Sequence, residues 1–123
     1  MLSKKILIID DDHRNIFALK AVLKAKGYNV LSATEAKEGI ALLRTDRDIN
    51  VLLLDMMMPE IDGYEAIALI RRDEEIASTT IIAVTAQAMV GDKEKCLAAG
   101  ADNYLSKPVD IDALSSLLSR YLN

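Results

Sequence analysis

Residues 5–12 of the chain read KILIIDDD: a lysine, four consecutive large aliphatic residues and three aspartates. An uninterrupted apolar run that ends abruptly in acid is typical of a parallel strand buried on both faces. We therefore predict a strand over Lys5–Ile9. Residues 51–55, VLLLD, repeat the pattern and predict a second buried strand over Val51–Leu54, which again ends in an acid, Asp55.

Longer segments of helical period alternate with such strands along the rest of the chain. We predict helices over Arg14–Lys26, Glu35–Arg47, Asp62–Arg72, Met89–Ala99 and Ile111–Leu122, and further strands over Tyr28–Ala33, Thr80–Thr85 and Ala101–Leu105. Five β/α repeats with short connections predict an α/β fold with a single doubly wound parallel sheet. Its expected strand order is 2-1-3-4-5, as in flavodoxin-like proteins, with five helices covering it. No linker composition interrupts the chain, so residues 1–123 are interpreted as one domain.

The composition excludes several kinds of protein. With 51% hydrophobic and 28% charged residues, the chain can build one core and is not disordered. A single cysteine, Cys96, excludes an internal disulfide and a cysteine-based zinc site, and one histidine excludes a His-rich metal site. A net charge of −4 argues against nucleic-acid binding. The apolar runs are too short for membrane insertion or a signal peptide, so we expect a cytoplasmic protein.

Polar groups follow the predicted strands at the points where they end. The strand ends carry Asp10 and Asp11 (first strand), Asp55 (third), Thr85 and Ala86 (fourth) and Lys107 (fifth). Because these ends share one edge of a parallel sheet, beside the point where the winding reverses, we expect the side chains to be neighbours. Each one alone has an ordinary explanation, but their coincidence at four strand ends favours a functional site.

The residue types indicate phosphoryl chemistry with a divalent ion. Packed carboxylates repel one another and Lys107 offsets only one charge, so a hard cation such as Mg²⁺ is expected among them. Asp55 is expected between the acidic pair and Lys107, which favours it as the nucleophile that attacks phosphorus and forms an acyl phosphate. Lys107, the Thr85 hydroxyl and the Ala86 backbone N–H would then neutralise the phosphoryl oxygens. Asp12 is expected to cap the next helix rather than bind the ion.

Four strings resemble the signature segments of response-regulator receiver domains from two-component signalling. They are ILIIDDD (6–12), VLLLDMMMPEIDGYEAI (51–67), IIAVTA (81–86) and AGADNYLSKP (99–108). They occur in that family's order and spacing, and the likeness covers essentially the whole chain. The resemblance implies a domain that takes a phosphoryl group from a histidine kinase or a histidine phosphotransfer protein. Residues 83–110 are similar in particular to receivers attached to hybrid sensor kinases, which leaves open whether the chain is free-standing or part of such a kinase.

The resemblance also implies roles for the matching residues at the acidic end of the site. Asp55 would be the phospho-acceptor, and Asp10 with Asp11 the acidic pair, with Asp11 binding Mg²⁺ directly. The Met57 backbone carbonyl would be a further metal contact. Met57 and Gln87 occupy positions that tune phosphoryl loss, and because a thioether orients water poorly, we expect slow self-dephosphorylation.

The remaining matches imply how a signal leaves the site. Thr85 would be the switch hydroxyl, Tyr104 the switch aromatic, and Lys107 the phosphoryl contact, joined to Pro108 by a cis peptide bond. Tyr104 would rotate inward on phosphorylation and reshape the face made by the fourth helix, fifth strand and fifth helix.

Helical phase raises a question about docking. Ala18, Leu19, Val22 and Leu23 are expected on the buried side of the first helix, with Phe17 nearly opposite. An exposed Phe17 beside the acidic mouth is either a docking contact for a helical phosphate donor or a singly exposed apolar residue of no special role.

Three other functions fit the sequence less well than a receiver. An aspartate-nucleophile phosphohydrolase usually carries a second acid two residues after its nucleophile, where this chain has Met57. A nucleotide or flavin binder would need a glycine-rich loop after the first strand, where this chain has three aspartates. A receiver that has lost its chemistry would lack some of the site residues, and all are present. We therefore interpret the chain as a phospho-acceptor signalling domain, not an enzyme with turnover.

Overall fold

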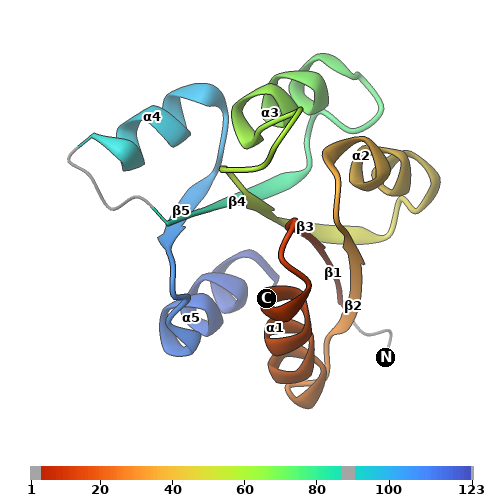
Figure 1. Ribbon diagram of the computed structural model, residues 1–123. Coiled ribbons are helices and arrows are strands. Elements are labelled where there is room, and N and C mark those ends of the chain that lie inside the picture. The colour runs from red at the N-terminus through yellow and green to blue at the C-terminus, as the bar shows by residue number, and fades with distance from the viewer. Residues whose placement is uncertain (1–3, 87–90, 123) are drawn as a thin grey trace.

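The computed structural model describes residues 4–86 and 91–122, which form alternating strands and helices (Figure 1). The strands are β1 (Lys5–Ile9), β2 (Asn29–Ala33), β3 (Ile49–Asp55), β4 (Thr80–Thr85) and β5 (Asn103–Ser106). The helices are α1 (His13–Ala25), α2 (Ala36–Thr45), α3 (Gly63–Arg72), α4 (Asp92–Ala99) and α5 (Ile111–Leu122). Within the described ranges, no helix is both long and apolar enough to pass through a membrane.

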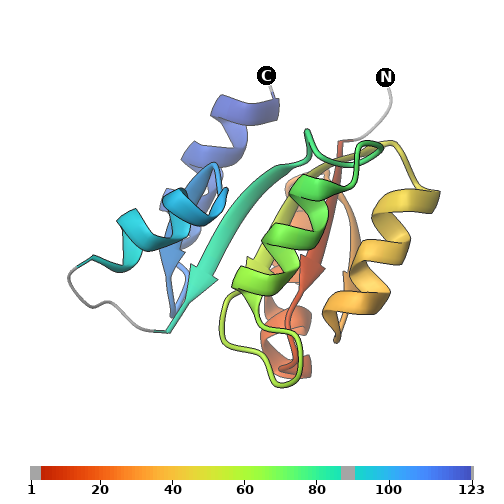
Figure 2. The same ribbon diagram turned by 90° about the horizontal axis from the view of Figure 1, so that it is seen from above.

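All five strands join one parallel sheet in the order β2-β1-β3-β4-β5, which confirms the predicted doubly wound fold. Ile9 of β1 pairs with Leu54 of β3, and Thr85 of β4 pairs with Ser106 of β5. Figure 2 shows the arrowheads directed toward one edge of the sheet. The residues that follow these pairs are therefore brought to a common edge, as the sequence predicts.

The sheet separates two hydrophobic layers. On β1, Leu7 and Ile9 face a layer built with α2, α3 and α4, whereas Ile6 and Ile8 face a layer built with α1 and α5. Figure 1 shows the same division of the helices between the two faces. Because both faces of β1 are covered, this strand needs an uninterrupted aliphatic run instead of an alternating one.

The buried stripe of α1 differs from the expected one at one residue. Leu19 and Leu23 are buried as predicted, and Val22 is half-buried. The prediction for Ala18 is wrong: Ala18 is exposed and Ile16 is buried in its place. Residues 16, 19 and 23 follow the spacing of one helical stripe, whereas Ala18 lies about 140° around the helix from Leu23.

Side-chain caps fix the beginnings of two helices. Asp12 Oδ1 accepts a hydrogen bond from the Arg14 backbone N–H (2.9 Å), which confirms Asp12 as the N-cap of α1. Asp62 Oδ1 accepts from the Glu65 backbone N–H (2.9 Å) at the start of α3. Both caps lie on the loops that lead away from the acidic strand ends, so they also direct the chain out of the site.

β3 extends two residues before and one residue beyond its predicted bounds, and α4 and β5 begin later than predicted. The strand expected from Ala101 begins at Asn103, because the Ala101 backbone N–H still donates to the Cys96 carbonyl at the end of α4 (3.1 Å). The described part of α4 begins at Asp92, and the residues Met89 and Val90 of the predicted helix lie outside the described residues.

Arg71, near the end of α3, ties several segments together. Its guanidinium donates to the carbonyl oxygens of Ala77, Thr79 and Gly100 over 2.6 to 3.0 Å and pairs with Asp102 (3.0 Å). One side chain therefore joins α3 to the loop before β4 and to the turn between α4 and β5. This set of contacts is named the Arg71 clamp below.

Candidate functional site

Three aspartates meet at the ends of β1 and β3. Asp55 is the last residue of β3, and Asp10 and Asp11 directly follow β1. One carboxylate oxygen of each lies within 4.8 Å of those of the other two. Asp10 is 3% and Asp55 4% exposed, whereas Asp11 is exposed. The predicted acidic group is thus assembled by the pairing of Ile9 with Leu54.

Lys107 reaches the same place from β5. Its backbone N–H donates to the Thr85 carbonyl (2.8 Å), and its peptide bond to Pro108 is cis, as expected. The Lys107 ammonium lies 3.2 Å from Asp10 Oδ2 and 3.5 Å from Asp55 Oδ1. The side chain therefore bridges the two buried carboxylates, one directly after β1 and one at the end of β3.

Asp10 is held by more groups than the sequence predicted. Its Oδ1 accepts from the Asp12 backbone N–H (2.9 Å), and its Oδ2 accepts from the Asn15 amide (2.6 Å) as well as from Lys107. Asn15 was not among the predicted site residues. Its signal was available, since Asn15 lies in the first turn of the helix capped by Asp12, close to the acidic strand end.

The charge of Asp55 is disfavoured by its surroundings. Burial raises the pKa of Asp55 to about 6, and the negative charge of Asp10 acts in the same direction. The Met57 backbone N–H, which donates to Asp55 Oδ1 (3.1 Å), and the Lys107 ammonium partly oppose this rise. Partial burial works to lower the pKa of Lys107, but the charges of Asp55 and Asp10 outweigh it, so that pKa is raised.

A glycine begins α3 and packs against the end of β3. The Gly63 backbone N–H donates to the Met56 carbonyl (3.2 Å). A Cβ atom at residue 63 would lie 2.6 Å from Met56 Cα and 3.1 Å from the Asp55 carbonyl oxygen. Neither backbone atom can yield as a flexible side chain would, so the start of α3 requires a residue without a side chain.

The expected switch residues lie on adjacent strands. Thr85 is buried at the end of β4, one residue beyond the Val84 that pairs with Asp55. Tyr104 of β5 pairs with Ala83 and is half-buried against the layer that contains α3 and α4. Ala86 directly follows β4 and is exposed, whereas Gln87 lies outside the described residues.

Two exposed apolar side chains flank the acidic mouth in sequence. Met57, two residues after Asp55, is 52% exposed, and Phe17 on α1 is 76% exposed. Phe17 therefore points away from the core, as helical phase predicted. Cys96, in contrast, is fully buried, as expected for a small core residue.

The donor set fits a hard divalent cation. Asp10, Asp11 and Asp55 offer only oxygen atoms, and Lys107 adds a single positive charge against three carboxylates. Magnesium binds through one or two carboxylates and completes its shell with water and phosphate oxygens. The exposed Asp11 leaves one side of the group open for such ligands.

Comparison with known proteins agrees with this geometry. The sequence model of one protein family, the response regulator receiver domain, matches residues 6–119. The polar-differentiation response regulator DivK of Brucella ovis is 30% identical over 121 residues, which cover 98% of this chain and 98% of DivK.

Two solved structures of similar sequence contain a further component, a magnesium ion in one and a histidine phosphotransfer protein in the other. The receiver domain of sensor histidine kinase PA1611 from Pseudomonas aeruginosa PAO1, solved with a magnesium ion coordinated in its active site cleft, is 33% identical with a TM-score of 0.87, over 98% of both chains. The co-crystal structure of the Saccharomyces cerevisiae histidine phosphotransfer protein Ypd1 with the receiver domain of Ssk1 matches at 26% identity and a TM-score of 0.86. That match covers 97% of this chain and 88% of the other.

Proposed function

This chain belongs to the family of response regulator receiver domains of two-component signalling, and from that premise we propose that it accepts a phosphoryl group on Asp55 from a phosphohistidine. The single observation that carries the proposal is the meeting of Asp55 with two further aspartates and a lysine from three separate strand ends. We take residues 1–123 as one such domain. The family is one of signalling domains, so the expected outcome of the chemistry is a changed protein surface.

The proposed transfer moves one phosphoryl group between two side chains. A carboxylate oxygen of Asp55 attacks phosphorus, the P–N bond to the donor imidazole breaks, and that nitrogen keeps the bonding electron pair. The product is an acyl phosphate on Asp55. Because attack requires the ionised carboxylate, groups that favour its charge, such as Lys107 and the Met57 N–H, support the reaction.

Charge on the phosphoryl oxygens needs donors on the open side of the site. Lys107, which already lies 3.5 Å from Asp55 Oδ1, is proposed to contact one oxygen. The Thr85 hydroxyl and the Ala86 backbone N–H, at the end of the neighbouring strand β4, are proposed to contact the others. Each comes from a strand end that pairing holds in place.

Asp10, Asp11, Asp55 and the Met57 backbone carbonyl are proposed to hold Mg²⁺. The ion would supply positive charge to the phosphoryl oxygens and relieve the repulsion among the carboxylates. Asn15 positions Asp10 for this task through its 2.6 Å hydrogen bond.

The phosphorylated state is proposed to be read through Thr85 and Tyr104. A hydroxyl drawn toward the phosphoryl group leaves space beside the aromatic ring, and Tyr104 then turns further inward. The face of α4, β5 and α5 would change with it. In energetic terms this is a population shift, limited by the difference in phosphoryl contacts between the two states.

The proposed partners are a histidine kinase or a histidine phosphotransfer protein. The Ypd1–Ssk1 complex supports this choice because its receiver shares 26% identity with the chain. Membership of a hybrid kinase is a further possibility supported by the PA1611 receiver, which belongs to a sensor histidine kinase. A net charge of −4 supports the expectation that the domain does not bind nucleic acid directly. The cytoplasmic location stays a prediction.

The test is incubation with Mg²⁺ and a small phosphodonor such as acetyl phosphate, followed by intact mass. We expect one phosphoryl adduct per chain, which Asp55→Ala abolishes. Asp12→Asn is the matched control, because Asp12 caps α1 and an asparagine can also cap; this variant should form the adduct normally.

The same measurement addresses the alternative of a phosphohydrolase. Several phosphate molecules released per chain per minute without a lasting adduct would favour the hydrolase and contradict the receiver proposal. An adduct that persists in Asp55→Ala would place the modification on another residue.

A further inference from the structure

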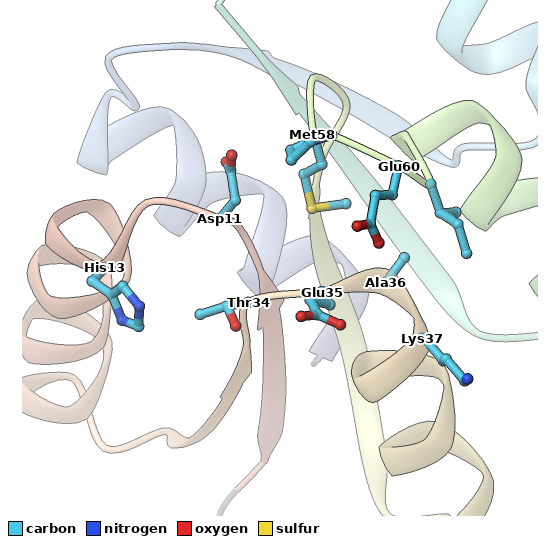
Figure 3. Close-up of a pocket in the computed structure, with 10 residues that line it drawn as sticks. Asp11, His13, Thr34, Glu35, Ala36, Lys37, Met58 and Glu60 are labelled. Carbon is cyan, nitrogen blue, oxygen red and sulfur yellow. The ribbon is translucent and has the colours of Figure 1, made fainter.

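A second feature lies beside the proposed phospho-acceptor and shares only Asp11 with the proposed chemistry. It is a cavity of about 340 Å³ lined by the loops that follow β1, β2 and β3 and by the first residues of α1 and α2. Figure 3 shows the residues that line it: Asp11, His13, Thr34, Glu35, Ala36, Lys37, Met58, Pro59, Glu60 and Ile61. We name it the side cavity. The inference below rests on the proposed function and deepens it by naming a feature of the phosphate donor.

The side cavity has an apolar floor and an acidic rim. Met58 and Ala36 are buried and Ile61 is half-buried, whereas Glu35 and Glu60 are exposed. Figure 3 shows Met58 and Glu60 extending from one side toward the start of α2 on the other, with the Lys37 ammonium directed away. Among the described residues, neither glutamate forms an ion pair. Both carboxylates are therefore available to a partner.

This combination matches a long basic side chain better than a bare ion. The three aspartates of the site meet the spacing of a metal group, and that group includes neither Glu35 nor Glu60. A lysine or arginine has an aliphatic stem that packs on apolar surface and a cationic end that stays near water and carboxylates. In the side cavity, the apolar floor would pack against the aliphatic stem and the glutamates of the rim would face the cationic end.

The position of the side cavity tells which molecule would bring such a side chain. Asp11 lines the cavity, and its carboxylate also lies within 4.8 Å of Asp55. Any protein that delivers a phosphoryl group to Asp55 must cover this mouth. On a helix that presents a phosphohistidine, residues three or four positions away lie about 5–6 Å from it on the same face. In the proposed arrangement, a lysine or arginine at such a position enters the cavity while the histidine faces Asp55.

We propose that the side cavity receives a lysine or arginine that lies about one helical turn from the phosphohistidine of the protein donor. The contact aligns the donor histidine with Asp55 and offsets the repulsion between a phosphorylated donor and an acidic mouth. Glu35 and Glu60 are thus specificity residues for protein donors and have no role with small phosphodonors.

The test compares protein and small donors on charge-neutral variants. A histidine phosphotransfer protein that phosphorylates the unaltered chain is first selected from a purified set that includes Ypd1. Transfer kcat/KM is then measured for Glu60→Gln, Glu35→Gln and the double variant. Glu65→Gln on α3 and Glu38→Gln on α2 remove the same charge from exposed glutamates outside the cavity and serve as matched controls. Acetyl phosphate with Mg²⁺ is the small donor for every variant.

We expect the double variant to lose about tenfold or more in kcat/KM with the protein donor, and the controls to change less than about twofold. Rates with acetyl phosphate should be unchanged throughout. Replacing each basic residue within one turn of the donor histidine by glutamine should identify one whose loss no longer matters once Glu35 and Glu60 are neutral.

Each contrary result has a distinct meaning. Equal losses in the double variant and the controls would overturn the side cavity as a specific contact and leave only general charge. No donor residue coupled to the glutamates would overturn the named occupant. Phosphorylation by acetyl phosphate but by no protein donor in the set would reject the inference and leave Asp55 as acceptor. Failure with both donor types would reject the proposed function itself.

Discussion

The surroundings of Asp55 disfavour its ionised form when no metal ion is bound. Burial and Asp10 raise its pKa to about 6, while the two residues that favour its charge, Lys107 and Met57, offset only part of that rise. A residue placed for chemistry in this way is not placed for stability. The acceptor position is therefore where a neutral replacement should strengthen the fold.

We predict that Asp55→Asn raises the free energy of unfolding in metal-free buffer at pH 7. The folded-state pKa of about 6 exceeds the ordinary value of 3.8. The original protein therefore loses stability as the pH rises from about 4 to about 6, and this loss persists at higher pH. The shift corresponds to about 3 kcal/mol at most. Urea unfolding in EDTA between pH 4 and pH 7.5 measures it, with the gap between the two proteins growing as pH rises.

Asp12→Asn is the control with the opposite sign. The Arg14 backbone N–H lowers the pKa of Asp12, so that carboxylate favours the fold above its pKa and the contribution is lost on acidification. If Asp55→Asn were no more stable than the original at pH 7 in EDTA, the account of a disfavoured charge at Asp55 would be wrong.

A second prediction at residue scale concerns Met57 and the lifetime of the phosphoryl group. Its backbone N–H serves Asp55 whatever the side chain, while its exposed thioether orients water poorly. We predict a half-life longer than seconds for the purified adduct. Met57→Asn should shorten it roughly tenfold, about the effect of one added hydrogen bond to the attacking water. Decay of the adduct mass gives the rates, and Met57→Leu should decay as the original does; a half-life of seconds in the original protein would contradict the prediction.

At the scale of elements, the pairing of β4 with β5 links the site to a surface. Thr85 ends β4 and Tyr104 lies on β5 two positions back in register, opposite Ala83. A movement of the Thr85 side chain can therefore affect the Tyr104 ring directly across the β4–β5 pair.

We predict that Thr85→Ala remains phosphorylatable on Asp55 but loses most of the change in Tyr104 environment. The NMR signals of the Tyr104 ring, recorded before and after Mg²⁺ and acetyl phosphate, report that change. Thr80→Ala, at the other end of the same strand, removes the same hydroxyl far from the site and should behave as the original. Equal ring shifts in Thr85→Ala and the original protein would rule out the hydroxyl as the link.

The Arg71 clamp gives a prediction about stability. Arg71→Met leaves three backbone carbonyls without this donor and removes the ion pair with Asp102, which should lower the free energy of unfolding by about 2–3 kcal/mol. Arg72→Met is the matched control, since Arg72 is exposed and, within residues 4–86 and 91–122, its side chain donates only to Ala68 of its own helix; it should change stability by less than about 0.5 kcal/mol. Similar losses from both variants in chemical denaturation would mean that the clamp contributes nothing specific.

Local signals predicted the elements well and their long-range contacts less well. The aliphatic runs of β1 and β3 and the caps Asp12 and Asp62 act within a few residues, so the sequence displays them. The Arg71 clamp joins residues 29 positions apart, to Gly100, and no local pattern marks it. Ala18 was misplaced because alanine fits both a core and a surface, so it does not define the phase of a helix as Ile16 does.

For the whole molecule, the strand order made the site predictable before its geometry was known. β1 and β3 are parallel neighbours at the point where the strand order reverses, so their C-terminal ends meet and Asp10 and Asp55 could be expected as neighbours. The side cavity could not be expected in the same way. Its walls come from three loops and from the first residues of α1 and α2, which are far apart in the sequence and share no local pattern.

Asp10, Asp11 and Asp55 are brought together by the pairing of β1 with β3, so they form one group in the folded protein and not in the unfolded chain. We therefore predict that Mg²⁺ stabilises the folded protein by mass action. At a concentration of 100 times its Kd the gain is about 2.7 kcal/mol, which should appear as a higher Tm. Asp11→Asn should show a much smaller rise, and NaCl at the same ionic strength controls for screening. Identical melting curves of the original protein in EDTA and in Mg²⁺ would show that the three aspartates do not form the ion site.

The close fit of Gly63 against Met56 has a consequence for how such a protein can diversify. A mutation there cannot be absorbed locally, because any added atom displaces the backbone that carries the acceptor. Substitution is therefore restricted at residue 63, whereas the exposed side chains of Glu35 and Glu60 face no such restriction. Under the proposal above, related proteins can change their phosphate donors through these glutamates while the residues of the reaction stay the same.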